Sequence, residues 1–186
     1  MISSVAAAGL VVIRAVGFPT MHAHEPTRDA IIEAAEAIMV AAPGCALITI
    51  GPDGAPQARM MNPFPPESLT VWMATNRDTR KVAEMRADPR VTLVYFDAAD
   101  PGYATLIGRV RLVDDPVEKR ARWKDEWSMY YPGGPEGASY LLIEFVPDRL
   151  EVVSVTHDIA ADPLAWKAAV VEFERRGTGA ASGPEC

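Results

Sequence analysis

Three cations lie close to a predicted strand-to-helix junction in the stretch MATNRDTRKVAEM, residues 73–85 of this 186-residue chain. An apolar run ends in a polar turn, and Arg77, Arg80 and Lys81 stand in that turn or in the first turn of the helix expected after it. A helix N-terminus offers unpaired N–H groups and a partial positive charge, so it attracts anions and repels nearby cations. The cations therefore predict a bound anion, and the alternative is a solvated helix surface with ordinary capping.

Neutral donors surround the same junction. They are Thr75, Asn76 and Thr79. Arg80 and Lys81 can each add a charge-assisted hydrogen bond that stabilises an anion by roughly 1.5–3 kcal/mol. Arg59, in the earlier stretch QARMMN, is a further cation, and we expect its strand to lie beside the strand that ends at residue 75. Arg59 would then reach the same anion.

The residues after Arg59 predict a flat apolar surface beside the anion. Met60, Met61 and Asn62 would present two polarisable side chains and a strand edge whose backbone groups can hydrogen-bond a planar ring. A methionine pair of this kind belongs more often to a core. The residues alone leave both interpretations open.

Apolar periodicity predicts the elements that hold these residues. The expected helices cover residues 26–42, residues 78–87, a segment that begins at Asp115-Pro116 and carries Trp123 and Trp127, and a short segment near 165–174. The expected strands are a hairpin around Pro52-Asp53-Gly54, the runs LTVWMAT, RVTLVYFD and YATLIGRVRLVDD, and two strands around a turn at Val146-Pro147-Asp148. About seven strands between inserted helices predict a mainly β fold, an antiparallel sheet closed into a small barrel with flanking helices.

Two common classes of nucleotide-binding fold are disfavoured. No Gly-rich loop leads from a strand into a helix, which argues against a Rossmann sheet and against a Walker-type phosphate loop. The formal net charge of −7 also argues against a nucleic-acid binder, because such proteins normally carry an excess of Lys and Arg.

One domain is expected, because no linker or repeat divides the chain. We expect residues 1–25 to be a leader or a disordered N-terminus, residues 26–156 to form the barrel, and residues 157–186 to form a C-terminal extension and tail. The run SVAAAGLVVI resembles the apolar part of a signal peptide, but no Lys or Arg precedes it, which favours a leader or an upstream start before Met21. A cytoplasmic protein is expected, and an exported form is the alternative.

The cysteines and histidines predict no redox or metal centre. Cys45 lies in an apolar run and is expected to be a buried apolar residue, and a disulfide with the terminal Cys186 is not expected. Two pairs have a spacing that could chelate a metal but lack a third ligand nearby, so no metal is expected. These pairs are His22 with His24 and His157 with Asp158. Trp123 and Trp127 are expected to be packing residues, and a lid over a ligand is the alternative.

Three stretches within residues 30–156 carry a resemblance to a known family: ALITIGPDGAPQARMMNPFPP, VWMATNRDTRKVAEMRADPRVTLVYFD and YATLIGRVRLVDDPVEKRARWKDEW. They resemble the pyridoxamine 5′-phosphate oxidase-like flavoproteins, and most closely the general stress protein 26 branch. The most specific feature is the Arg-Met-Met-Asn strand followed at the right separation by the Thr-Asn-Arg-Asp-Thr-Arg-Lys turn. The resemblance implies a Greek-key split β-barrel that binds FMN and works as a homodimer with flavin sites at the subunit interface.

The resemblance also implies roles for individual residues. The residues implied in holding the FMN phosphate are Arg59, Thr79, Arg80 and Lys81. Those implied along the isoalloxazine ring are Met60, Met61 and Asn62, with Thr75 at the other edge of the ring and Tyr103 in the region by which the second subunit reaches the flavin. The C-terminal substrate-binding segment of the oxidase proper has no counterpart after Val155, which argues against oxidation of pyridoxine 5′-phosphate.

Three functions are compatible with this site. The first is an oxidoreductase that passes electrons from a nicotinamide or another donor through FMN to a small molecule. The second is a flavin-binding stress protein without turnover, and the third is a reductase of the same fold that uses the deazaflavin F420. No side chain stands out as an acid, base or nucleophile, and none is required where the cofactor carries the reaction.

Overall fold

The computed structural model describes residues 25–99 and 101–174 of the chain. The elements in chain order are α1 (Arg28–Ala41), β1 (Cys45–Ile50), β2 (Pro56–Met61), β3 (Val71–Asn76), α2 (Arg80–Ala87), β4 (Arg90–Tyr95), β5 (Tyr103–Val113), α3 (Pro116–Ala121), the 3₁₀ helices η1 (Asp125–Met129) and η2 (Gly134–Glu136), β6 (Tyr140–Val153) and β7 (Ala169–Glu172). In the part of the chain that is described, no helix is long and apolar enough to cross a membrane. The predicted leader lies almost entirely outside the described residues.

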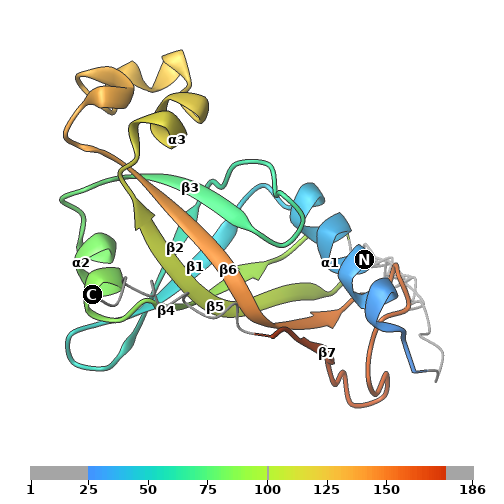
Figure 1. Cartoon of the computed structure of the whole chain (residues 1–186). Helices are drawn as coiled ribbons and strands as arrows, with labels where there is room; N and C mark the ends of the chain where they lie inside the picture. The colour runs from blue at the N-terminus through green and yellow to red at the C-terminus, as the bar shows by residue number, and fades with distance from the viewer. Residues whose placement is uncertain (1–24, 100, 175–186) are drawn as a thin grey trace, which may run out of the picture.

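All seven strands described belong to one antiparallel sheet in the order β2-β1-β4-β5-β6-β3, with β7 added beside β6. The strands curl around one core, and β2 and β3, at the two ends of the order, do not pair with each other (Figure 1). The predicted antiparallel split barrel is therefore confirmed. The prediction that β2 and β3 lie side by side as a pair is wrong, because the connection over residues 62–70 takes the chain to the far end of the sheet, where β3 pairs with β6.

The predicted hairpin joins β1 and β2 as the turn residues require. Gly54 has a φ of 80°, a value that few residues other than glycine adopt, and the Gly51 N–H donates to the Ala55 carbonyl at 2.8 Å. Residues alternate between the core and the outer face along β1, so Cys45, Leu47 and Thr49 all point inward. Thr49 is thus a fully buried polar residue at the end of an apolar row.

The segment with Pro147 forms one long strand and not the two predicted strands. β6 runs without interruption from Tyr140 to Val153 and pairs with β5 from Leu142 to Val153, with a register shift between Ile107 and Gly108. Pro147 and Asp148 lie at this irregularity, where a strand tolerates a residue that has no N–H to donate. Pro147 therefore bends a continuous strand, and the predicted turn at this point is wrong.

The last described element also differs from the prediction. The helix expected near residues 165–174 is absent there, and β7 pairs with β6 through Arg149–Val152. Ala169 and Val171 are buried while Val170 and Glu172 are exposed, so this segment follows the period of a half-buried strand. The free edge of β6 outweighs the weak helical pattern of this short segment.

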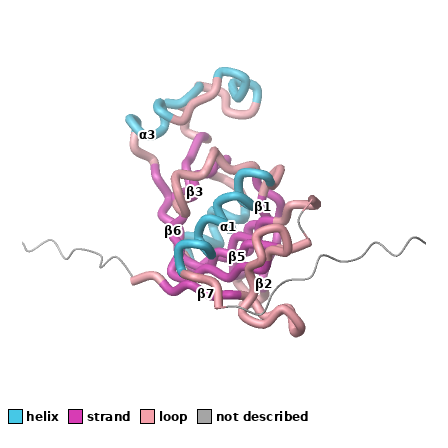
Figure 2. Tube along the Cα trace, turned by 90° about the vertical axis from the view of Figure 1, so that its right-hand side faces the viewer, coloured by secondary structure: helices cyan, strands magenta, loops and turns pink. Residues whose placement is uncertain are grey.

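The α1 helix covers one end of the barrel. Thr27 caps the helix by accepting a hydrogen bond from the Ala30 N–H at 3.3 Å, and Ile31, Ala35 and Ile38 are buried on its inner face. Figure 2 shows α1 lying along the sheet close to β5 and β6. The predicted amphipathic helix is confirmed with slightly shorter bounds.

A separate group of rings packs against the outer face of the barrel. Residues 116–136, here called the aromatic lobe, contain α3, η1 and η2 and project beyond β3 and β6 (Figure 1). The rings of Trp123, Trp127 and Tyr131 lie 5.2, 6.2 and 5.0 Å from the ring of Tyr140, centroid to centroid. The Asp115 cap is confirmed by hydrogen bonds from the N–H groups of residues 117 and 118.

The predicted single helix carrying both tryptophans is wrong. α3 ends at Ala121, so Trp123 lies beyond it and Trp127 lies in η1. The two indole rings meet edge to face, with centroids 6.4 Å apart, and both turn toward Tyr140 on β6. Packing around this buried tyrosine therefore sets the local backbone, and the interpretation of both tryptophans as packing residues fits the structure.

Candidate anion-binding site

A tight turn connects β3 to α2. The Asn76 side-chain oxygen accepts a hydrogen bond from the Asp78 N–H at 2.9 Å, and the Asn76 carbonyl accepts one from the Thr79 hydroxyl at 2.9 Å. Thr79 is the N-cap of α2, but its side chain makes no capping hydrogen bond. Within the described residues, the N–H groups of Arg80 and Lys81 have no hydrogen-bond partner. These two donors are free to bind an anion at the N-terminus of the helix.

Arg59 is held at this junction by two neighbouring side chains. Its Nη1 donates to the Thr49 hydroxyl oxygen at 2.5 Å, and its Nη2 donates to Oε2 of Glu84 at 2.7 Å. The Thr49 hydroxyl donates to the same Oε2 at 2.6 Å. Thr49 lies on β1, Arg59 on β2 and Glu84 in the second turn of α2, so three elements meet at this point. Arg59 thus reaches α2 although β2 does not pair with β3.

Glu84 is the buried acid of this cluster, with a side chain only 2% exposed. Arg80 Nε lies 3.0 Å from Oε1 of Glu84 as an ion pair, yet Oε1 has no hydrogen-bond partner among the described residues. Burial alone would raise the pKa of Glu84. Hydrogen bonds from Thr49 and Arg59, with the charges of Arg59 and Arg80, outweigh that effect and lower the pKa, so Glu84 is ionised at neutral pH.

Lys81 is a half-buried cation with no ion pair or hydrogen bond to any residue that the structure describes. Burial lowers the pKa of Lys81, the positive charge of Arg59 lowers it further, and Glu84 opposes both effects. Lys81 is therefore an incompletely compensated positive charge beside another cation. A bound anion would relieve that repulsion.

Arg77, the first cation of the opening stretch, does not belong to the cluster. Its Nε donates to the Ala138 carbonyl at 2.8 Å, its Nη2 pairs with Asp114 at 2.5 Å, and its backbone N–H donates to the Ser139 carbonyl at 2.8 Å. All three contacts lead to the chain on either side of the aromatic lobe. The prediction that Arg77 helps to hold the anion is not supported by this geometry.

Strand alternation separates the residues of the predicted ring surface. Met61 is partly buried and packs against the main core, whereas Met60 is 70% exposed on the outer face, and the exposed Asn62 follows the end of β2. β2 is also the last strand in the sheet order, so its outer backbone edge is not paired within the sheet. The exposed Met60 side chain and this edge are the parts of the motif available to a ligand.

The structure brings most of the other predicted site residues to the junction. Thr75 is buried at the end of β3, with its hydroxyl oxygen 3.4 Å from that of Thr79. Tyr103 begins β5, which is the third strand away from β2, and no described hydrogen bond or ion pair joins it to the cluster. Its role beside a flavin stays a prediction that concerns a second copy of the chain.

Sequence reasoning missed the two polar residues that hold Arg59 in place. Glu84 stands four residues after Arg80, a spacing that places both on one helix face. Thr49 stands at an inward position of a strand that otherwise reads as apolar. Both signals are present in the sequence, but only the tertiary fold shows that they converge on Arg59.

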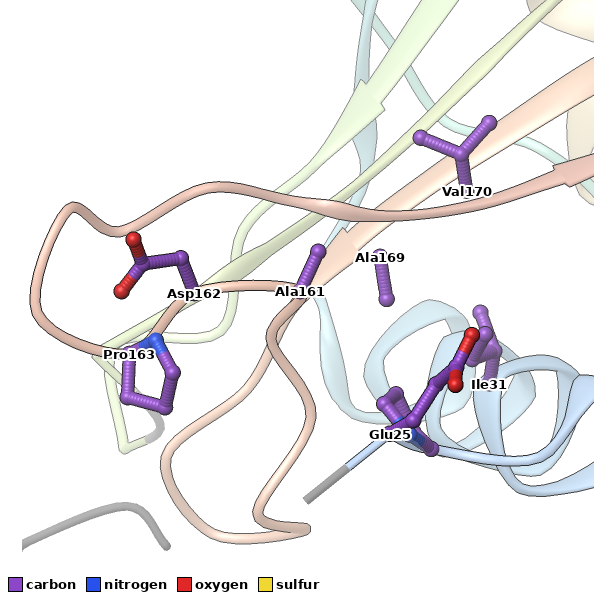
Figure 3. Close-up of a pocket in the computed structure, with 8 residues that line it drawn as sticks. Glu25, Ile31, Ala161, Asp162, Pro163, Ala169 and Val170 are labelled. Carbon is purple, nitrogen blue, oxygen red and sulfur yellow. The ribbon is translucent and has the colours of Figure 1, made fainter. Parts of the chain in front are cut away.

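A cavity outside the cation cluster suits a phosphate poorly. Its volume is about 610 Å³, and it lies between the start of α1 and the loop that leads into β7 (Figure 3). Its charged lining residues are two acids, Glu25 and Asp162. Acidic side chains repel anions, so the cation cluster remains the candidate for phosphate.

Cys45 is buried as predicted, and burial raises the pKa of its thiol to about 11. Among the described residues, no three His, Cys, Asp or Glu side chains gather as a metal site would require. His22, His24 and Cys186 lie outside the described residues, and His157 Nδ1 lies 2.8 Å from the Ser154 hydroxyl oxygen.

Comparison with known proteins identifies the family. The family model for pyridoxamine 5′-phosphate oxidase matches residues 31–154, and the chain belongs to this family. The family predicted from the three sequence stretches is thereby confirmed. A search of the curated proteins found no match to this chain.

Solved structures share the fold at low sequence identity. A Clostridium acetobutylicum protein related to general stress protein 26 is 19% identical, with a TM-score of 0.65 over 80% of this chain and 97% of that protein. The general stress protein 26 of Bacillus anthracis is 23% identical, with a TM-score of 0.58 over 66% of this chain and 93% of that protein. A protein named F420 reductase is 20% identical, with a TM-score of 0.50 over 62% and 94%.

Proposed function

We propose that this protein binds FMN and uses it as an oxidoreductase acting on a small molecule. The observation that carries the proposal is the incompletely compensated Lys81 beside Arg59, at the open N-terminus of α2, in a member of this family. A terminal phosphate would neutralise these cations and accept hydrogen bonds from the free N–H groups of Arg80 and Lys81. The site residues present therefore suit a phosphate monoester.

The residues of the chain would divide the work of binding. Arg59, held on one side by Thr49 and Glu84, would present its remaining donors to the phosphate. The flat ring would lie along the outer edge of β2, where the Met60 side chain is exposed and the backbone can hydrogen-bond the polar rim of the ring. The bound flavin supplies the redox chemistry in such proteins, so no nucleophilic side chain is needed.

We also propose that the protein is a homodimer with two flavin sites at the subunit interface. In one chain the outer face of β2 stays exposed at Met60, and Tyr103 lies three strands away from it. Contact with a second chain would bury that face and bring its Tyr103 to the flavin. Light scattering of the purified protein should give twice the 20.1 kDa chain mass, and a monomer that still binds FMN tightly would contradict this arrangement.

F420 is the second candidate cofactor, because a protein named F420 reductase shares this fold. F420 carries its phosphate as an internal diester with one charge, whereas FMN ends in a monoester that is nearly doubly charged at neutral pH. Three cations against one carboxylate at the junction favour the doubly charged group. Competition between the two cofactors for the apoprotein would decide between them.

The first test is the visible spectrum of the purified protein before and after FMN is added and the sample is desalted. We expect flavin bands to remain after desalting and to bleach when a suitable electron donor is supplied. Bands that remain but resist every donor would indicate a flavin carrier without turnover. A protein that keeps no FMN would contradict the proposed cofactor.

A matched pair of variants tests the position of the phosphate. Arg80→Ala removes an exposed arginine from the first turn of α2, and Arg86→Ala removes one from its last turn. We expect Arg80→Ala to weaken FMN by about tenfold relative to riboflavin, which lacks the phosphate, and Arg86→Ala to leave the ratio unchanged. Equal effects of the two variants would place the phosphate elsewhere.

A further inference from the structure

Glu84 is an unexpected residue in a cluster of cations that we propose binds an anion. Its carboxylate lies within 2.7 Å of one arginine and 3.0 Å of another, and its side chain is almost fully buried. Burying an ion pair costs desolvation energy that apolar residues of similar size would not cost, so such a pair is weak support for stability alone. A carboxylate at this place therefore calls for another explanation.

We propose that Glu84 is a positioning residue that orients Arg59 for the phosphate and partly compensates the charge of the cation cluster. The proposal rests on the proposed FMN site and adds a role for an acid that does not itself contact the ligand. It explains why Arg59 is hydrogen-bonded to Thr49 and Glu84 beside α2 and still keeps donors that these bonds do not use.

The hydrogen bonds show how the orientation is set. Glu84 accepts a hydrogen bond from Nη2 of Arg59 and Thr49 accepts one from Nη1, so both terminal nitrogens of the guanidinium group are held. Thr49 is itself fixed by its donation to Glu84 at 2.6 Å. A guanidinium group has five N–H donors, and these two bonds leave three for a ligand. The triangle of side chains thus fixes the guanidinium group and leaves three of its N–H donors available to a ligand.

The second part of the role concerns the charge of the cluster. Arg59, Arg80 and Lys81 bring three positive charges, and Glu84 is the one acid that the structure places in contact with them. The cluster therefore keeps a net charge of +2, which matches a phosphate dianion. Glu84 also raises the pKa of Lys81 against the effects of burial and of Arg59, so it helps to keep the lysine protonated for the ligand.

Two substitutions separate orientation from charge. Glu84→Ala removes the acceptor and frees Arg59, whereas Glu84→Gln keeps an oxygen that can accept from both Arg59 and Thr49 and removes only the charge. The amide nitrogen of Gln would take the place of Oε1, which has no hydrogen-bond partner, and the exposed Arg80 side chain can move away from it. Glu144→Gln is the matched control, because that acid pairs with Arg111 on the sheet, outside the cluster.

The measurement uses inorganic phosphate as well as FMN. We expect phosphate, compared with chloride at equal ionic strength, to raise the melting temperature of the unmodified protein and of the Glu144→Gln control. Glu84→Ala should lose most of this shift and bind FMN about tenfold more weakly relative to riboflavin. Glu84→Gln should keep the shift and an FMN preference at least equal to that of the unmodified protein.

The outcomes distinguish this inference from the proposed function. If phosphate raises the melting temperature of a protein that retains no FMN, the proposed cofactor is rejected. The role of Glu84 is then still tested by the effect of phosphate on the melting temperatures of the variants. An Ala variant with an unchanged shift, or a Gln variant as weak as the Ala variant, would overturn the role of Glu84. Equal losses of affinity for FMN and riboflavin would show that Glu84 has only a structural role. An unmodified protein whose melting temperature does not rise with phosphate would also overturn the inference.

Discussion

Replacing Lys81 with methionine tests whether the cation cluster exists to hold a phosphate. Methionine keeps the unbranched apolar stem and removes the ammonium group, so the packing of the half-buried side chain changes little. In the structure, the lysine has no described ion pair to lose. Replacing Lys81 should therefore weaken FMN binding more than it changes the stability of the fold.

The expected magnitude follows from the contact that Lys81 would make. A charge-assisted hydrogen bond contributes roughly 1.5–3 kcal/mol. At 1.36 kcal/mol for each factor of ten, Lys81→Met should weaken FMN roughly 10- to 150-fold. Riboflavin, which has no phosphate, should bind the variant as it binds the unmodified protein. Titration of the apoprotein with both ligands, followed by flavin fluorescence, gives the two dissociation constants.

The pH dependence supplies an independent check on the same residue. Burial, with the charge of Arg59, lowers the pKa of Lys81 below its ordinary value of 10.5. The preference for FMN over riboflavin should therefore fall as the pH rises through that lowered pKa, because the neutral amine no longer attracts the phosphate. Lys81→Met should show no such fall in this range.

The unliganded protein should respond in the opposite direction. Between the lowered pKa of Lys81 in the folded state and 10.5, the unfolded chain binds more protons than the folded one, so the free energy of unfolding rises with pH. Lys81→Met should accordingly be at least as stable as the unmodified protein at neutral pH. A variant that loses FMN and riboflavin equally, or that loses neither, would refute the assignment of Lys81 to the phosphate.

Three further predictions concern the barrel and the aromatic lobe. In a Cys186→Ser background, Cys45 should resist a thiol reagent at pH 8 until the protein is unfolded, because burial raises the pKa of its thiol to about 11; rapid reaction of the folded protein would contradict this. Trp127→Ala should lower the free energy of unfolding by about 3 kcal/mol in urea, since it removes a ring that contacts four others, and an unchanged midpoint would contradict the packing role. Gly108→Ala should destabilise by about 1–3 kcal/mol in the same assay, because its Cβ would lie 2.2 Å from the Val146 carbonyl oxygen, whereas a neutral effect would show that β6 shifts freely there.

The sequence was most informative where one local rule decides the structure. The turn at Gly54, the cap at Asp115 and the period-two alternation of β1 and β4 each depend on a few neighbouring residues. The strand-to-helix junction before α2 belongs to the same class. These features required no knowledge of what packs against them, and the structure has them close to their expected bounds.

The wrong predictions lie where distant parts of the chain decide. Pro147 reads as a turn residue, but β5 pairs on both sides of it and keeps β6 continuous. Residues 169–172 read weakly as a helix, but the free edge of β6 draws them into the sheet. The hydrophobic pattern of a short segment does not show which strand it will pair with. Local periodicity alone therefore could not predict this pairing.

The site shows the same limit at the level of single charges. Arg77, Arg80 and Lys81 look equivalent along the sequence, yet the acids that they meet in the fold give them different roles. Asp114, next to the aromatic lobe, forms an ion pair with Arg77. Glu84 forms ion pairs with Arg80 and Arg59, and the positive charge of Lys81 stays incompletely compensated. A count of cations at a helix start therefore indicates an anion, but the acids decide which cations remain for it. Lys81, with the donors of Arg59 and Arg80 that Glu84 does not occupy, remains here, which is why we propose a phosphate monoester as the ligand of this junction.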